Sequence, residues 1–420
     1  MISKILGTIG SRFLVMLLTF LVVMMNSQIL GAEGQGTAAL IQLGVLIVVA
    51  ANNYVGGGAI VYLAPRISPS KLVLPAYLWA LFCALIAYLI FQWIPSVPDN
   101  YIAAICALGL LQSLFTFHLQ LLLAQEKIKA YNIIVTIQSV VLAGALACSF
   151  FVFKIIEIEA FVMALAASFS ATFLLALIAS KKVLTRESFK WHNDAWKAMW
   201  NYGKFAQTGN VLQLFNYRLN LFFLEHLLVA SRGLVGVYSV GLYASEAVWN
   251  FSKSLSVVQY ARISNSEDAK YNQKLTVTFF HLSLISTLLV VGVMLVIPQE
   301  IYTWVFGSDM EELKQILYIL SIGMLVNACS VIFAHHFSGT GKYHLNTISS
   351  GLALLASIVS GLILIPNYEL MGAAWTATIA YSVQGITLGY FFLKEELVSS
   401  KILLPKMESW KFFRSLNDSD

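Results

Sequence analysis

Charged residues are scarce in this sequence. They make up 11% of its 420 residues, whereas a soluble globular domain carries about 25%. Hydrophobic residues make up 59%, which is more apolar surface than one soluble core hides. The shortage of charge excludes an ordinary soluble fold and places the chain in the membrane class.

Cysteine and catalytic motifs are also sparse. The four cysteines lie in apolar runs without CxxC or histidine-linked spacing, so we interpret them as small buried hydrophobic residues instead of disulfides or metal ligands. The sequence contains no GxSxG, Walker lysine or HExxH motif and no aspartate-rich cluster. These absences predict a protein that is not an enzyme and has no cofactor, no metal and no nucleic-acid partner. The cysteines are Cys83, Cys106, Cys148 and Cys329.

Long apolar segments dominate what is present. A helix needs about 20 apolar residues to cross about 30 Å of hydrocarbon, and segments of this length recur with no soluble domain between them. The first is long and lacks a clear cleavage site, so we expect a retained helix and not a signal peptide. The predicted spans are 9–30, 37–63, 72–94, 101–124, 131–153, 158–180, 204–229, 234–260, 275–297, 313–338, 345–365 and 370–393.

Basic residues are distributed unevenly over the connections. If the N-terminus is cytoplasmic, cytoplasmic segments hold 21 of the 26 Lys and Arg residues, and the opposite side holds only Lys154, Arg232 and Lys314. This is the positive-inside bias of membrane proteins. It predicts twelve helices with both termini cytoplasmic. The outer loops are short and acidic, so no external domain is available for an active site.

The chain divides at its midpoint and repeats. We expect a six-helix lobe over 1–180, a cytoplasmic interfacial linker over 181–203, a second six-helix lobe over 204–393 and a cytoplasmic tail over 394–420. Residues 31–36 (GAEGQG) resemble 230–236 (ASRGLVG), and 64–68 (APRIS) resemble 260–264 (YARIS). Both pairs are about 200 residues apart. They predict an all-α integral membrane protein of two lobes related by a parallel pseudo-twofold repeat, an architecture of secondary transporters.

The clearest ionisable side chains inside predicted spans, where each costs about 2.5–3.5 kcal/mol, are Arg218, Glu246 and Lys253. At about 1.5 Å per residue, Arg218 lies roughly 16 Å deep and Glu246 roughly 15 Å deep on the next helix. The two are therefore expected to pair at mid-membrane. Lys253 lies on the same face as Glu246 but roughly 10 Å further along, too far for a direct salt bridge between them. The pair is either a packing element or part of a cationic cavity, and Lys253 either snorkels to the interface or lines that cavity.

Neutral polar groups accompany these charges. His118 and His335 occupy roughly equivalent places in the two halves, where they either are simply hydrogen-bonded or add positive charge and relay protons. Asn52 and Asn53 precede three glycines at 56–58, and Asn250 lies between Glu246 and Lys253. We take these side chains as candidate substrate-binding residues: Arg218, Lys253, Asn52, Asn53, Asn250, His118 and His335, with Glu246 as an ion-pair or coupling residue.

Several of these segments carry a family resemblance. The stretches 31–36 (GAEGQG), 56–58 (GGG) and 61–66 (VYLAPR), with 216–220 (NYRLN), 235–239 (VGVYS) and Glu246, resemble Wzx-type O-antigen flippases. These belong to the polysaccharide branch of the multidrug/oligosaccharidyl-lipid/polysaccharide exporter superfamily. The resemblance implies a flippase in the bacterial inner membrane that moves a polyprenyl-diphosphate-linked oligosaccharide to the periplasmic leaflet by alternating access. It also implies membrane lipids, a polysaccharide polymerase and glycosyltransferases as partners.

Two alternatives stay open. The first is a cation-coupled multidrug exporter of the same superfamily, which would favour an acidic cavity, whereas the charges inside these spans are at least as basic as acidic. The second is a membrane-embedded polysaccharide polymerase or ligase, which usually carries a large periplasmic loop. No large outer loop is predicted here.

Overall fold

The computed structural model describes residues 2–93, 97–183, 190–228 and 232–404. Within them the chain is helical, with the long helices α1 (Ile2–Gly56), α3 (Ser70–Trp93), α4 (Ile102–Ala124), α5 (Ile128–Ala147), α6 (Ile158–Ser180), α7 (Asn193–Leu227), α8 (Arg232–Ser264), α9 (Ala269–Val296), α11 (Leu313–Gly339) and α12 (Tyr343–Glu395). Shorter helices are α2 (Gly58–Leu63) and α10 (Gln299–Phe306).

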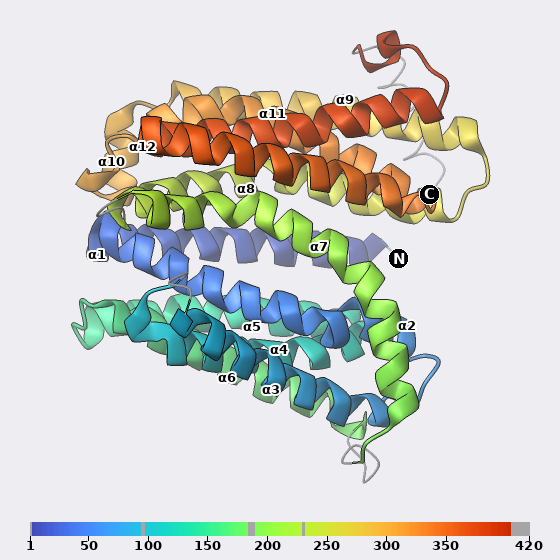
Figure 1. Ribbon diagram of the computed structural model, residues 1–420, viewed down its shortest axis with the longest axis horizontal. Coiled ribbons are helices and arrows are strands. Elements are labelled where there is room, and N and C mark those ends of the chain that lie inside the picture. The colour runs from blue at the N-terminus through green and yellow to red at the C-terminus, as the bar shows by residue number, and fades with distance from the viewer. Residues whose placement is uncertain (1, 94–96, 184–189, 229–231, 405–420) are drawn as a thin grey trace. The chain divides into compact units, whose positions relative to one another are not determined.

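Two of these helices, α1 and α12, each consist of two helical halves joined at a sharp bend. α1 bends at Gly31, whose φ of 70° is left-handed, and α12 bends at Glu369, whose φ is 46°. From each bend the two halves run back toward the same end (Figure 1). Eight unbroken long helices and these four halves give the twelve membrane-length stretches that the sequence predicts. The fold is all-α, as expected.

Eight helices in the described residues are long and apolar enough to cross a membrane. Their outward side chains are apolar as well: Trp93 is 86% exposed and Leu289 is 67% exposed. Such surfaces are stable in contact with lipid tails and not with water. The chain is therefore a multi-span membrane protein. α7 and α8 are absent from these eight helices, because both carry many polar residues.

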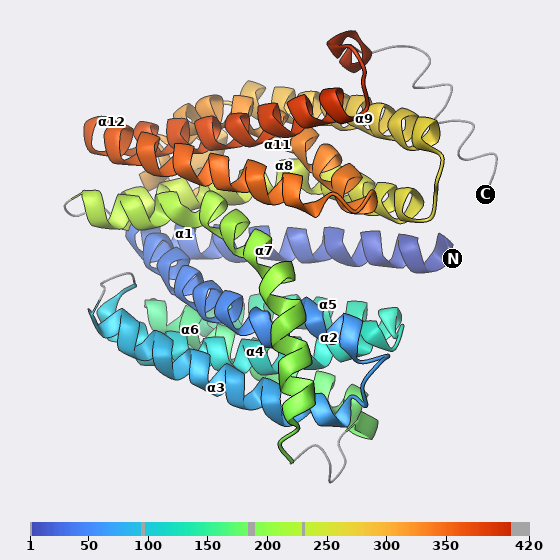
Figure 2. The same cartoon turned by 45° about the vertical axis from the view of Figure 1, so that its right-hand side comes forward.

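The chain forms two compact units. Unit 1 comprises residues 1–211, 230–236 and 305–309, and unit 2 comprises 212–229, 237–304 and 310–420. In unit 1, α3, α4 and α6 lie side by side, and α1, α4, α5 and α6 enclose a core rich in alanine, valine and phenylalanine (Figure 2). In unit 2, α11 packs between α9 and α12 (Figure 1).

The first part of α7 belongs to unit 1. Ala195 and Met199 are buried in a small core with α2 and the beginning of α3, and Gln207 Nε2 donates to the carbonyl oxygen of Ala50 at 3.2 Å. The predicted linker over 181–203 is thus partly helical, from Asn193 onward. Residues 184–189 of that linker, 230 and 231 of the repeat, and 405–420 of the tail lie outside the described residues.

The repeated segment 31–36 and residues 232–236 of its counterpart contact each other inside unit 1. A Cβ atom on Gly36 would lie 1.9 Å from the carbonyl oxygen of Arg232, and one on Gly236 would lie 1.8 Å from that of Ala32. Only glycine permits so close a backbone approach. Beside this crossing, Asp309 Oδ2 accepts the Ala32 backbone N–H at 3.2 Å and so caps the second half of α1 after the Gly31 bend.

Candidate functional site

The charged side chains of α7 and α8 meet within unit 2. Arg218 Nη2 lies 2.7 Å from Glu246 Oε1, and the two side chains are 15% and 27% exposed. Arg218 also lies 5.6 Å from the centre of the Tyr243 ring. The structure therefore contains the ion pair anticipated from the depth of the two residues. A carboxylate this close offsets much of the guanidinium charge.

Aromatic rings surround the pair. Tyr217 stacks on Trp249 with ring centres 5.5 Å apart, and Tyr381 meets both rings edge-on at 5.7 and 5.5 Å. The Trp249 indole N–H and the Tyr381 hydroxyl are buried, and neither has a hydrogen-bond partner among the described residues. An unsatisfied buried donor is costly. Two such donors in one cluster therefore mark a place suited to a polar ligand.

Amide side chains fix this cluster in place. Asn220 Nδ2 donates to the Tyr238 hydroxyl at 2.9 Å and to the carbonyl oxygen of Ala373 at 3.2 Å. Gln213 Nε2 donates to the Tyr217 hydroxyl at 2.7 Å, and Asn216 Nδ2 donates to a carbonyl oxygen of α12 at 3.0 Å. The amides therefore hold α7 against α8 and α12 and position the aromatic rings around Arg218.

Lys253 lies two turns beyond Glu246 on α8. Its ammonium is 5.6 Å from the centre of the Trp249 ring, within the range of a cation–π interaction. Asn250 is half-buried on the same stretch of α8. Trp249 thus lies between the region of the ion pair and that of the ammonium.

The remaining predicted residues occupy other places. His335 is half-buried, and its Nδ1 donates to the carbonyl oxygen of Val331 at 2.8 Å. Asn52 and Asn53 lie on α1 in unit 1. Asn52 is 1% exposed, and neither polar atom of its side chain has a hydrogen-bond partner among the described residues. The side-chain amide oxygen Oδ1 of Asn53 is likewise unpartnered there.

His118, also in unit 1, is enclosed. Its Nε2 lies 2.6 Å from the Tyr77 hydroxyl and its Nδ1 lies 2.7 Å from Ser180 Oγ. The ring is fully buried. Both nitrogens are therefore satisfied by the protein, and in this conformation the ring has no nitrogen left for a ligand.

The aromatic part of the site was not singled out from the sequence. Tyr243, Glu246 and Trp249 are three residues apart on α8, the spacing that places side chains on one helix face. This spacing could have indicated that Tyr243 and Trp249 lie beside Glu246. No sequence pattern indicates Tyr381, because it comes from α12, far along the chain.

Comparison with known structures identifies similar folds among membrane transporters. No protein-family model matches the sequence. The structure is similar to a multidrug resistance MATE family transporter of the MOP superfamily in its inward-facing conformation, with a TM-score of 0.73, 13% identity and coverage of 91% of this chain and 94% of that one. It is also similar to the lipid II flippase MurJ in an inward closed conformation, with a TM-score of 0.74, 13% identity and coverage of 100% and 93%.

A curated relative is similar over part of the sequence. It is the capsular polysaccharide biosynthesis protein CapF of Staphylococcus aureus, which is 27% identical over 172 residues. The match spans 39% of this chain and 43% of that protein. The chain therefore has a transporter fold, similar both to that of a MATE family transporter of the MOP superfamily and to that of the lipid II flippase MurJ.

Proposed function

We propose that this chain is a flippase that moves a polyprenyl-diphosphate-linked oligosaccharide, such as an O-antigen or other surface polysaccharide repeat unit, from the cytoplasmic to the periplasmic leaflet of a bacterial inner membrane. The observation that carries the proposal is the placement of Arg218 of α7 and Lys253 of α8 near two buried aromatic donors, Trp249 of α8 and Tyr381 of α12. The likeness to a lipid II flippase and the partial likeness to a capsular polysaccharide protein support it.

The chemistry of such a substrate matches these side chains. A diphosphate is an anion that needs positive charge, and a sugar needs neutral hydrogen-bond donors and aromatic faces. Lys253 is the anchor for the diphosphate, and Arg218 helps it from a position tied to Glu246. Asn52, Asn53 and Asn250 serve as neutral polar contacts. His335 gives its Nδ1 hydrogen to Val331, so it offers the substrate an acceptor at Nε2 while neutral and a donor there when its ring is protonated. For His118 to bind substrate it must first leave its present partners.

In this proposal the membrane potential supplies the free energy for moving the anionic substrate outward. Moving one charge across 100 mV is worth about 2.3 kcal/mol, so a diphosphate with two negative charges gains about 4–5 kcal/mol on leaving an inside-negative cell. Transport then needs no nucleotide site. The lobes 1–180 and 204–393, joined by the linker 181–203, alternate access to the two leaflets in this scheme, with both termini in the cytoplasm.

Lys253→Ala tests the anchor. Loss of a charge-assisted contact should reduce flipping at least about tenfold while the protein still inserts. Lys253→Arg should keep part of the activity, because the charge remains but its geometry differs. The measurement is surface polysaccharide per unit of membrane-inserted protein in a deletion strain. Normal transport by Lys253→Ala on that scale would show that the anchor is elsewhere.

Arg218 and Glu246 provide a matched pair of variants. Arg218→Ala leaves a partly buried carboxylate without its partner and should destabilise the protein by about 3 kcal/mol, which lowers the inserted amount. Arg218→Ala combined with Glu246→Ala should recover the amount without restoring full transport. A double variant as scarce as the single one would contradict the ion-pair explanation.

The likeness to a MATE family transporter favours one alternative, a cation-coupled multidrug exporter. The two proposals differ in what a deletion strain accumulates. A flippase defect leaves lipid-linked sugars on the cytoplasmic side, whereas an exporter defect lowers resistance to cationic drugs. Unchanged lipid-linked sugars together with increased drug sensitivity would favour the exporter.

A further inference from the structure

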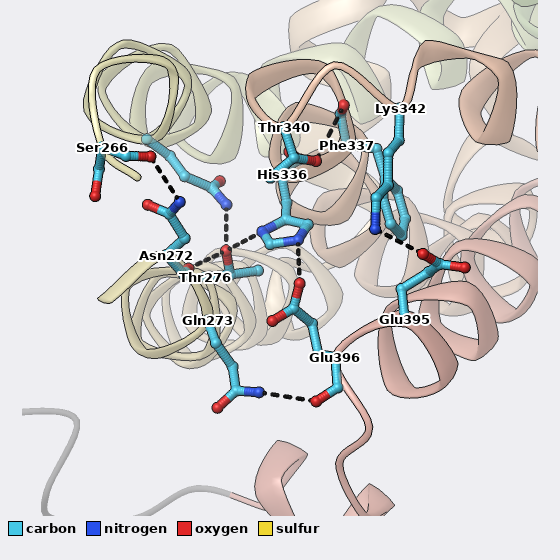
Figure 3. A network of polar contacts seen from close by, with 11 residues as sticks. Ser266, Asn272, Gln273, Thr276, His336, Phe337, Thr340, Lys342, Glu395 and Glu396 are labelled. Carbon is cyan, nitrogen blue, oxygen red and sulfur yellow. Dashed lines mark hydrogen bonds and ion pairs between the residues drawn. The ribbon is translucent and has the colours of Figure 1, made fainter. Parts of the chain in front are cut away.

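A second buried histidine, His336 on α11, contacts a carboxylate. Its Nε2 lies 3.1 Å from Glu396 Oε1, just after the last residue of α12 (Figure 3). The His336 side chain is 1% exposed, and that of Glu396 is 14% exposed. The Phe337 and Phe392 rings pack edge-on against the imidazole with ring centres 5.4 and 5.1 Å away. The histidine is thus shut off from water, and the carboxylate is not.

The other ring nitrogen fixes the tautomer. His336 Nδ1 lies 2.9 Å from Thr276 Oγ1 on α9. The Thr276 hydroxyl has a single proton, and it donates that proton to the carbonyl oxygen of Asn272 at 2.8 Å. Gln259 Nε2 from α8 also donates to the same hydroxyl oxygen, at 2.9 Å. Since the hydroxyl proton is already used, His336 Nδ1 must carry a hydrogen and donate it.

This assignment leaves one proton to be placed between His336 Nε2 and Glu396 Oε1. A neutral ring with hydrogen on Nδ1 has only a lone pair on Nε2, and an ionised carboxylate has only lone pairs as well. Two lone pairs 3.1 Å apart repel. The contact is favourable only when a proton is bound, either as imidazolium with carboxylate or as imidazole with carboxylic acid.

We propose that His336 and Glu396 form a proton-binding site that holds the end of α12 against α11. Loss of the proton to solvent, through the exposed edge of Glu396, would release that end. Gln273 of α9 adds a second contact, because its Nε2 donates to the Glu396 carbonyl oxygen at 3.3 Å (Figure 3). Beyond it, His281 Nε2 lies 3.1 Å from the carbonyl oxygen of Leu403. The segment 399–404 is therefore attached next to the proton site.

The neighbouring charged residues do not provide His336 with another carboxylate among the contacts described. Glu395, the next carboxylate, lies 2.6 Å from Lys342 Nζ at a more exposed position. Other charged or titratable groups on the surrounding helices, on the connection before α9 and on the segment that follows include Tyr260, Arg262, Glu267, Asp268, Lys270, Tyr271, Lys274, His335, His344, Lys394 and Lys401. Among the contacts described, Glu396 is the carboxylate that touches the His336 ring. The bond is present while the proton is bound and is lost as the pH rises.

Histidine NMR on the full chain in nanodiscs tests the protonation state. With ¹⁵N-labelled histidine, we expect one signal in which both nitrogens are protonated or share a proton with a carboxyl group, and it should disappear in His336→Gln. In Glu396→Gln, the amide can donate to Nε2, so His336 should become a neutral ring with hydrogen on Nδ1. A wild-type His336 that is neutral with its hydrogen on Nε2 would overturn the proposal.

A labelling experiment tests the mechanical consequence without measuring transport. A cysteine placed at Leu403, which is half-buried in the attached segment, should react with a soluble maleimide about tenfold faster once the proton has left, since a charge-assisted bond is lost. The same cysteine in Glu396→Gln should show no such rise beyond the intrinsic effect of pH on the thiol. His344→Gln, at an exposed position at the start of α12, is the matched control and should behave like wild type. Equal pH profiles in wild type and Glu396→Gln would refute the release.

Discussion

Two of the buried histidines, His118 in unit 1 and His336 in unit 2, both contact a hydroxyl through Nδ1 and differ in the kind of group that contacts Nε2. In unit 1, Ser180 Oγ donates to the carbonyl oxygen of Ala176 at 2.7 Å, so His118 Nδ1 must donate to Ser180. In unit 2, Thr276 plays the part of Ser180 and His336 that of His118. A hydroxyl that donates to its own helix thus sets the tautomer in both places.

The difference lies at the other nitrogen. Tyr77 offers His118 Nε2 a hydroxyl proton at 2.6 Å, so the unit 1 centre is satisfied while neutral. Glu396 offers His336 a carboxylate, which has no proton to give while it is ionised. The same imidazole is therefore a fixed packing element beside tyrosine and a proton carrier beside glutamate. Partner chemistry, more than burial, separates the two roles.

Removing the unit 1 histidine should have the largest effect. His118→Ala leaves a cavity and the Tyr77 hydroxyl without its acceptor, so we expect a loss of about 3 kcal/mol. The measurement is the apparent Tm of the purified protein in detergent, at two pH values. The loss should be the same at both if both lie above about pH 7, because the histidine is then neutral in the folded and in the unfolded chain. His344→Ala is the exposed control, and an unchanged Tm for His118→Ala would show that the centre does not stabilise unit 1.

Removing only the Tyr77 hydroxyl should have an intermediate effect. Tyr77→Phe keeps the ring packed on Phe117 but leaves the His118 Nε2 lone pair buried and unsatisfied. We expect a loss of about 1–2 kcal/mol, seen as a smaller fall in Tm than for His118→Ala. A larger fall than for His118→Ala would mean that the tyrosine acts through contacts other than the histidine.

The smallest effect is expected at the exposed pair beside the unit 2 centre. Lys342 and Glu395 are 39% and 36% exposed, and exposed ion pairs contribute little. Lys342→Gln should leave Tm and the release of the segment 399–404 as in wild type. If Lys342→Gln altered the release as strongly as Glu396→Gln does, the exposed pair of Lys342 and Glu395, and not Glu396 alone, would hold the segment.

Much of the fold follows from the sequence. Hydropathy and the distribution of basic residues predicted twelve helical stretches, including α7 and α8, which are too polar to be recognised by apolarity alone. Counting depth along two neighbouring helices brought Arg218 and Glu246 together, because both distances start from the same turn. These inferences needed only local periodicity and short connections.

The finer contacts did not follow. The sequence matched His118 with His335, whereas the corresponding hydrogen-bond pattern belongs to His336. Adjacent residues point about 100° apart around a helix, so the face that packs inward decides the role, and a run of apolar residues does not reveal that face. Glu396 was not connected to His336 because the two are far apart in sequence and meet only when α11 and α12 pack.

The glycine crossing in unit 1 has the form of a contact between two identical subunits. Residue 32 faces residue 236 and residue 232 faces residue 36, so each partner offers the same carbonyl and the same bare Cα. Homodimers with twofold symmetry make contacts of this kind. The offset of 200 residues means that a duplicated half chain would meet its copy at this point. Within one polypeptide, the crossing thus has the reciprocal form of a twofold contact.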